Sequence, residues 1–272
     1  MSVPPLMESS FHFVVDLFFS RWPQPVPAME KLKNCKIVSH RGEHDNRTVF
    51  ENTMEAFDRV LEAGVWGIEL DIRWTRDLHP VVFHDPDLMR LFGSDRRISE
   101  ILQKELRNHF PMIPHLSEVI QKFGKKLHFM VEIKKEVYPD PVYQNQVLKS
   151  LFSPLTPKKD FHILTLSPEM FPILSFTDPS AFLPISETNF IRLSKLSREK
   201  RYGGITGHYL FLSNPLLKKH RKIRQKIGTG FISSRNALFR ELNRDIDWIF
   251  SNHAVKLQGI RNEFLKKAVS PR

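Results

Sequence analysis

The chain of 272 residues lacks several features that would assign it to common classes of protein. It has a single cysteine, Cys35, so it can form no internal disulfide, as is usual for proteins of a reducing compartment. It has no apolar run near the roughly 18 residues that a membrane-spanning helix needs. No lysine or arginine precedes the first apolar stretch, so we expect no secretory signal and a cytoplasmic location.

Glycine is also scarce, with 11 residues, and no glycine-rich loop follows the first predicted strand. This absence argues against a dinucleotide-binding domain. The hydrophobic fraction of 41% is that of a globular protein rather than a disordered one. A single α/β barrel commonly has this length.

Acidic residues are few in the last third of the chain. Residues 191–272 contain 19 lysines and arginines against 5 acidic residues, whereas residues 1–190 contain 22 against 25. The densest basic part, residues 218–226, would attract phosphate substrates, acidic lipid surfaces or nucleic acid, and a solvated helix face is the ordinary alternative. No nucleic-acid-binding motif accompanies the charge, so we expect no specific nucleic-acid partner.

The domain organisation is predicted from composition. Residues 1–34 form an N-terminal extension that ends in a proline-rich link at 22–27, and residues 35–272 form one domain. Within the extension, residues 11–19 are apolar but are interrupted by Asp16. Such a segment is more often a helix docked on its domain than one lying on a membrane surface, and the sequence leaves both readings open.

Strands alternate with helices along the predicted domain, which indicates parallel pairing with right-handed crossovers. This alternation, together with the missing glycine-rich loop, favours a (β/α)8 barrel over an open doubly wound sheet. There are nine extended segments for eight barrel strands, and we expect the surplus one to be 203–212. The nine segments are 36–39, 67–73, 80–83, 127–134, 160–166, 181–186, 203–212, 228–233 and 247–252.

Unusual polar residues lie where these predicted strands end. In a barrel the carboxyl ends of the strands meet at one face, where active sites are built. Glu69 and Asp71 share one face of their strand, and burying both without a partner would be costly. A divalent cation is one solution, and a solvated strand face is the other. The whole set comprises His40, Arg41, Glu69, Asp71, His84, Glu132 and Lys134.

A third carboxylate, Glu132, lies on another predicted strand. We expect this strand to be two strands away from the one that carries Glu69 and Asp71. Three carboxylates from two strands would make a hard-oxygen site for Mg²⁺ or Ca²⁺. Zinc is disfavoured because no histidine or cysteine cluster has ligand spacing.

Two histidines, His40 and His84, are suited to acid–base work near neutral pH. Arg41 and Lys134 would supply positive charge for a phosphate group. Each residue alone has an ordinary structural explanation. Together with a metal ion, they indicate phosphodiester cleavage.

Six short motifs carry a family resemblance. In order and approximate spacing they resemble those of the glycerophosphodiester phosphodiesterases, firmly over residues 36–134 and weakly beyond. The motifs are His40-Arg41-Gly42, Glu51-Asn52-Thr53, Glu69-Leu70-Asp71, Val82-Phe83-His84-Asp85, residues 113–118 and Glu132-Ile133-Lys134.

The resemblance implies a TIM barrel and a divalent-metal-dependent hydrolysis of glycerophosphodiesters to glycerol 3-phosphate and an alcohol. It implies that the substrate's own hydroxyl attacks phosphorus and that water opens the resulting cyclic phosphate. Glu51 and Asn52 would be structural supports near the site. The implied roles are His40 and His84 as the acid–base pair, Glu69, Asp71 and Glu132 as metal ligands, and Arg41 and Lys134 as phosphate-binding residues.

The chain departs from the family pattern in its late strands. Residues 231–234 replace the usual Trp-Thr-Val-Asn, and Ser251-Asn252 replaces the usual Thr-Asp. These strands help to shape the substrate pocket, so the alcohol moiety is left open. Two alternatives to the small glycerophosphodiester stay open as well. One is a lysophospholipid or another phospholipid headgroup cleaved at an anionic membrane surface, and the other is a non-catalytic module that binds a phosphate ligand.

Overall fold

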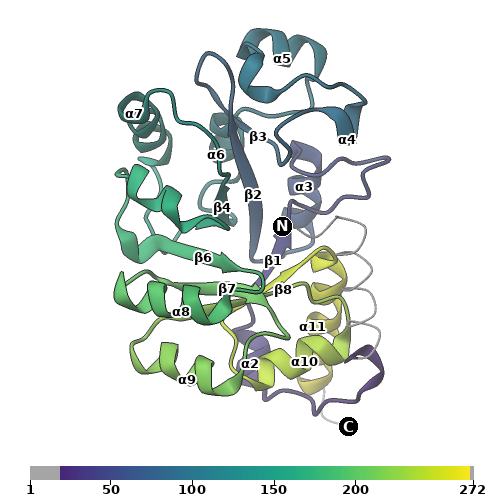
Figure 1. The fold of residues 1–272 in the computed structure, drawn as a ribbon. Helices are drawn as coiled ribbons and strands as arrows, with labels where there is room; N and C mark the ends of the chain where they lie inside the picture. The colour runs from purple at the N-terminus through teal and green to yellow at the C-terminus, as the bar shows by residue number, and fades with distance from the viewer. Residues whose placement is uncertain (1–18, 270–272) are drawn as a thin grey trace.

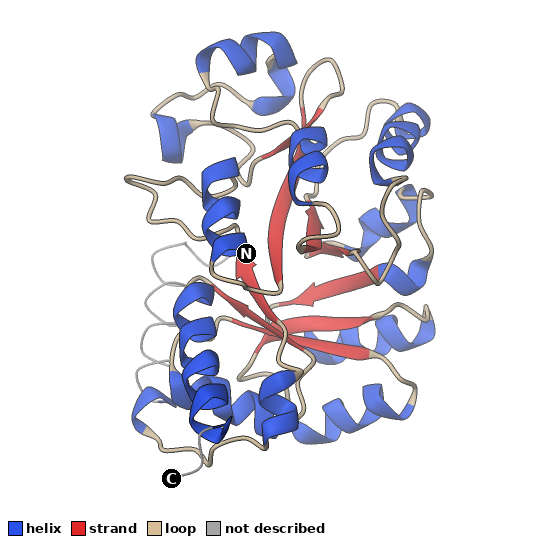
Figure 2. Ribbon diagram, turned by 180° about the vertical axis from the view of Figure 1, so that it is seen from behind, coloured by secondary structure: helices blue, strands red, loops and turns tan. Residues whose placement is uncertain are grey.

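The computed structural model describes residues 19–269, and these form a closed barrel of eight parallel strands (Figures 1 and 2). Consecutive barrel strands pair in sequence order, and the last pairs with the first, which closes the barrel. The fold is therefore the predicted TIM (β/α)8 barrel. Its strands are β1 (Ile37–His40), β2 (Gly67–Trp74), β4 (His128–Ile133), β5 (Phe161–Thr165), β6 (Phe182–Ser186), β7 (Gly204–His208), β8 (Lys226–Gly230) and β9 (Trp248–Ser251).

Helices surround the barrel on its outside (Figure 2). The connection from β5 to β6 uses two short 3-10 helices, η2 (Pro168–Ile173) and η3 (Pro179–Ala181), where the other crossovers use α-helices. The α-helices of the outer ring are α3 (Met54–Glu62), α6 (Leu116–Phe123), α7 (Pro141–Phe152), α8 (Phe190–Glu199), α9 (Asn214–Lys222), α10 (Arg235–Asn243) and α11 (Ala254–Val269).

Helix α3 shows how local sequence sets this ring. The Thr53 side chain caps the helix by accepting a hydrogen bond from the backbone N–H of Ala56. Phe57 and Val60 on one face of the helix are fully buried, and the Phe57 ring packs edge-on against Phe123 of α6 at 5.9 Å. Capping and an apolar stripe at helical spacing thus place α3 against the barrel.

The surplus strand is β3 (Pro80–Val82), and our expectation that it would be 203–212 is wrong. Strand β3 pairs antiparallel with the end of β2, with Trp74 opposite Pro80, whereas Gly204–His208 is the regular barrel strand β7. The physical reason is the length of the connection. The turn between Trp74 and Pro80 is too short for a parallel crossover, which takes a dozen or so residues, so the chain can only fold back on itself.

Residues 83–114 form a small cap beside this hairpin, where we expected mainly loops. It contains α4 (Met89–Phe92), η1 (Ile98–Glu100) and α5 (Gln103–His109), at the top of Figure 1. Buried side chains that include Phe83, Leu88 and Ile98 give the cap a hydrophobic cluster separate from the main core. The cap therefore sits beyond the carboxyl end of β2.

The described part of the N-terminal extension packs against the end of the chain. Helix α2 (Met29–Lys33) lies beside α11, whose Arg261 donates hydrogen bonds from its guanidinium to the carbonyl oxygens of Leu32 and Lys33. The boundary between 34 and 35 stays a prediction, and residues 11–18 of the apolar segment lie outside the described residues. Across residues 19–269, no helix is both long and apolar enough to span a lipid bilayer.

Candidate active site

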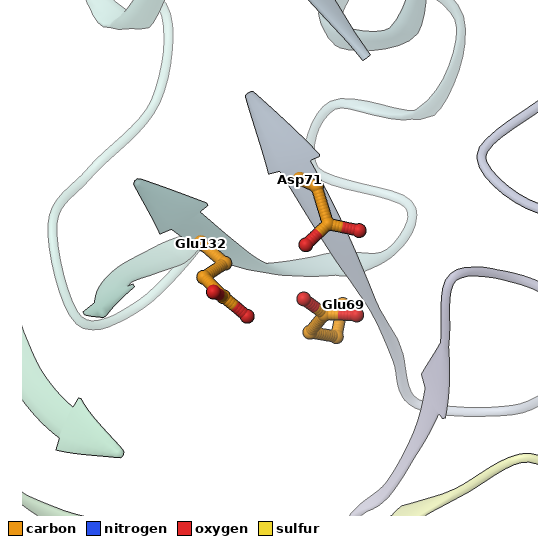
Figure 3. A group of neighbouring side chains, drawn as sticks. All are labelled: Glu69, Asp71 and Glu132. Carbon is orange, nitrogen blue, oxygen red and sulfur yellow. The ribbon is translucent and has the colours of Figure 1, made fainter. Parts of the chain in front are cut away.

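The three predicted carboxylates converge at the carboxyl end of the barrel. Glu69 and Asp71 come from β2 and Glu132 from β4, and Figure 3 shows the three side chains pointing into one space. One ligand oxygen from each lies within 4.8 Å of the others, and all three residues are buried. Asp71 lies opposite Glu132 in the strand register, so Glu132 is on the adjacent strand and not two strands away. The reason is that β3 is not a barrel strand.

Nearby positive charge compensates Asp71 more fully than it compensates Glu69. Burial, and then the charges of Asp71 and Glu132, hold the pKa of Glu69 well above its usual range. Burial also acts to raise the pKa of Asp71, but Lys134 and Arg41 outweigh it and hold that pKa well below its usual range.

Glu69 Oε1 is buried and has no hydrogen-bond partner among residues 19–269. An unpartnered buried oxygen inside a set of three carboxylates fits a divalent cation with oxygen ligands. The residues present are therefore able to hold the metal ion that the family resemblance implies.

The two predicted phosphate-binding cations border the cluster. Lys134 Nζ lies 2.6 Å from both Asp71 Oδ1 and Glu132 Oε1. Arg41 donates from Nη1 to Glu51 Oε1 at 3.0 Å, and its Nε lies 3.4 Å from Asp71 Oδ2. Both cations are thus already paired with carboxylates, and a phosphate group would share them.

A tight turn after β1 delivers Arg41 to this position. Arg41 and Gly42 have φ values of 60° and 84°, in the left-handed region. A Cβ atom on Gly42 would lie 2.7 Å from the Cβ of Ala56, so glycine is required both by conformation and by space. The Arg41 N–H donates to the Glu69 carbonyl at 3.0 Å, which ties the turn to β2.

His40 is held from two sides. Its Nδ1 lies 2.6 Å from Asn252 Oδ1, and its ring packs edge-on against Phe231 at 5.1 Å. The amide oxygen is an acceptor, so Nδ1 carries the proton, and Nε2 lies 3.7 Å from Glu69 Oε2. Burial, and then the Arg41 charge, lower the pKa of His40 to about 3.

His84 reaches the site by a route that the sequence did not predict. We expected His84 at the carboxyl end of a barrel strand. It instead follows β3, which is antiparallel and is not a barrel strand. The hairpin folds back far enough for the N–H of Phe83 to donate to the Asp71 carbonyl at 3.0 Å. The His84 ring is oriented by Asp85, whose Oδ1 is 2.7 Å from Nδ1.

Three further residues lie beside the site, and of these the sequence predicted a supporting role only for Asn52. Arg90 of the cap donates to Asp85 and to Glu51. Asn52 donates from Nδ2 to Asp71 Oδ2 at 2.7 Å, as a support near the site. In the sequence, Asn252 stands out only as a departure from the family pattern. No sequence motif predicts the contact of Arg90 with Glu51, because the two residues are 39 positions apart and the cap brings them together.

The fold and the cluster define a class of protein: a TIM barrel with a buried acidic site at the carboxyl ends of its strands, where the active sites of such barrels lie. Comparison with known families is more specific. Residues 40–188 match the model of the glycerophosphoryl diester phosphodiesterase family, and the chain belongs to this family.

Relatives and solved structures agree with this assignment. The chain is 34% identical over 127 residues to a glycerophosphodiester phosphodiesterase of Caldanaerobacter subterraneus, a match covering 42% of this chain and 51% of that protein. It thus spans about half the length of the curated relatives it matches first.

Solved structures share the fold. A glycerophosphodiester phosphodiesterase of Thermotoga maritima superposes with a TM-score of 0.68 at 22% identity, covering 83% of this chain and 98% of that one. An Oleispira antarctica phosphodiesterase in complex with its product sn-glycerol-3-phosphate gives 0.66 at 17% identity, with 82% and 95% covered.

Proposed function

We propose that this protein hydrolyses glycerophosphodiesters to glycerol 3-phosphate and an alcohol in a divalent-metal-dependent reaction. The observation that carries the proposal is the convergence of Glu69, Asp71 and Glu132 beside His40 at the carboxyl end of the barrel. Family membership supports the reaction class, and the product bound to the Oleispira antarctica neighbour supports a glycerol phosphate as the ligand. A cytoplasmic location is part of the proposal.

In this proposal the three carboxylates hold Mg²⁺ or Ca²⁺, the hard cations that take oxygen ligands. When bound, the ion supplies positive charge that polarises a phosphoryl oxygen. Arg41 and Lys134 bind the remaining phosphate oxygens and stabilise charge that develops on them. Both side chains are mostly buried, which strengthens their interaction with an anion.

His40 and His84 form the acid–base pair. One imidazole takes the proton of the attacking hydroxyl as its oxygen bonds to phosphorus, and the other gives a proton to the departing alcohol as the phosphorus–oxygen bond breaks. Asn252 and Asp85 accept from the two Nδ1–H groups, which leaves each Nε2 as the nitrogen that exchanges a proton. The two rings are close enough that a charge on His84 lowers the pKa of His40.

The decisive test is a substrate panel with metal add-back. Purified protein is treated with EDTA, then assayed with Mg²⁺ or Ca²⁺ on glycerophosphocholine, glycerophosphoethanolamine, glycerophosphoglycerol and lysophosphatidylcholine. We expect release of glycerol 3-phosphate that depends on added metal and is absent from Asp71→Asn. Full activity in EDTA would overturn the metal assignment. Activity on the lysophospholipid alone would replace the soluble substrate by a phospholipid headgroup at a membrane surface.

A further inference from the structure

A second site lies at the opposite end of the barrel from the carboxylate cluster. It is a pocket of about 580 Å³, a size typical of pockets that take small ligands. Most of its lining residues lie just before or at the starts of strands, as shown by Lys36 before β1, Lys158 before β5 and Trp248 at the start of β9, and Arg198 lies in the last turn of α8. It therefore opens at the amino-terminal ends of the strands and is distinct from the candidate active site.

The lining of the pocket is strongly basic. It contains no aspartate or glutamate. Lys226 is paired with Asp247 at 2.7 Å, but the other five cations form no ion pair with any carboxylate of residues 19–269. The six cations are Lys36, Lys158, Arg198, Arg201, Arg224 and Lys226.

Three of the cations occupy backbone positions that rarely carry such side chains. Lys158, Arg201 and Arg224 have φ values of 67°, 54° and 61°, in the left-handed region where glycine and asparagine are favoured. Arg201 and Arg224 follow the ends of α8 and α9, where a cation also offsets the negative end of the helix dipole. The helix dipole does not account for Lys36, because this residue precedes a strand. Its ammonium lies 5.1 Å from the ring centre of Trp66.

Two further observations agree with an anionic ligand. The buried indole Nε1–H of Trp248, in the pocket wall, has no acceptor among residues 19–269. Burial is the main cause that lowers the pKa of His162 to about 3, and the charges of His128, Lys36 and Lys158 lower it further. Trp66 already stacks on His128 at 4.3 Å, so the pocket offers charge more than a free aromatic surface.

We propose that this basal pocket binds a small anion carrying two or more phosphate groups, through the five cations that form no ion pair within residues 19–269. A single phosphate would leave most of this charge unmatched, whereas a multiply phosphorylated group would match it. The same chemistry occurs in a soluble polyphosphate and in the headgroup of a polyphosphoinositide lipid. The proposal is independent of the hydrolysis reaction.

The test uses the full chain in EDTA, so that no divalent metal contributes. Inorganic triphosphate and orthophosphate are titrated by isothermal calorimetry at 50 and 200 mM salt, with fluorescence of the tryptophans as a second signal. The soluble and lipid sources are separated by cosedimentation with phosphatidylcholine vesicles that contain phosphatidylinositol 4,5-bisphosphate. Binding of triphosphate alone indicates a soluble polyphosphate, and binding of the vesicles alone indicates the lipid headgroup. Binding of both indicates that the pocket accepts either source.

The test variant is Arg198→Gln, Arg201→Asn and Arg224→Asn, where asparagine tolerates the left-handed backbone. The matched control is Lys104→Gln, Lys125→Asn and Lys149→Gln, which removes the same charge outside the pocket and includes one left-handed position, φ 62° at Lys125. Circular dichroism and the hydrolase assay confirm that both variants are folded.

We expect wild-type protein and the control to bind triphosphate, or the vesicles, at least about tenfold more tightly than orthophosphate, and more weakly at high salt. The test variant should lose at least about tenfold in affinity. Absence of binding, equal losses in the two variants, or no preference over orthophosphate would overturn the proposal.

Discussion

Asp71 and Glu132 lie opposite each other in the register of β2 and β4, and Lys134 Nζ bridges them at 2.6 Å from each. This pair supplies two of the three carboxylates, while Glu69, two residues before Asp71, supplies the third. The arrangement compensates the buried charges of Asp71 and Glu132 internally, whereas Glu69 Oε1 has no hydrogen-bond partner among residues 19–269.

The first prediction concerns metal binding measured without catalysis. Mg²⁺ or Ca²⁺ at about 100 times its dissociation constant should raise the melting temperature of the wild-type protein by roughly 5 °C. Glu69→Gln should abolish this shift, because it replaces the carboxylate by a neutral amide at the position whose Oε1 has no hydrogen-bond partner among residues 19–269. Without metal it should be at least as stable as the wild type, since it relieves carboxylate repulsion. Glu62→Gln, on an exposed position of α3, is the control and should keep the full shift. A shift that survives in Glu69→Gln would refute the assignment.

The second prediction concerns the acid–base pair. His40→Ala and His84→Ala should each lower kcat by about 100-fold or more, because each removes a proton-transfer group. His109→Ala, on an exposed position of α5, should leave kcat unchanged. Initial rates are compared after circular dichroism has shown that each variant is folded. Near-normal turnover in either of the first two variants would exclude that histidine from the reaction.

The third prediction assigns Asn252 a positioning role through His40. Asn252→Ala should lower kcat by about tenfold with little change in KM, since it removes the acceptor that fixes the imidazole. Asn252→Asp keeps an acceptor and adds a charge that favours imidazolium, so it should recover most of the activity. It should also move the acidic limb of the pH–rate profile to higher pH. A profile identical to that of the wild type would contradict the role.

The fourth prediction concerns stability in acid. His128 Nε2 and His162 Nδ1 lie 2.8 Å apart, and burial above all lowers their pKa values to about 4 and about 3. In the unfolded chain both would titrate near 6.5, so below that pH the unfolded state binds more protons. The free energy of unfolding should therefore fall as the pH drops from about 6.5 toward 4, by about 2 kcal/mol per histidine at pH 5.

Urea unfolding at pH 7.5 and pH 5 checks this fourth prediction. His162→Phe should show a smaller fall in the free energy of unfolding, and the exposed His79→Gln should show the wild-type fall. If the free energy of unfolding fell equally in His162→Phe and in the wild type, other groups would control stability in acid.

Part of the site is encoded in local sequence patterns. Period-two alternation placed Glu69 and Asp71 on one strand face, and the ends of predicted parallel strands pointed to one common face. The β2–β3 hairpin was missed because propensity marks an extended segment and not its direction. The short turn after Trp74 is the local signal that indicates an antiparallel pair.

Alternation, capping and short motifs are local properties of the chain, so they were enough to predict the class of fold, the family and the candidate residues of the site. Long-range packing was needed to show that Glu132 adjoins Asp71, that Asn252 contacts His40 and that Arg90 links Asp85 to Glu51. It alone gathered cations from separate loops around the basal pocket. These relationships depend on strand order and loop placement, which are set by packing of the whole barrel. The spacing of residues close in sequence therefore does not predict them.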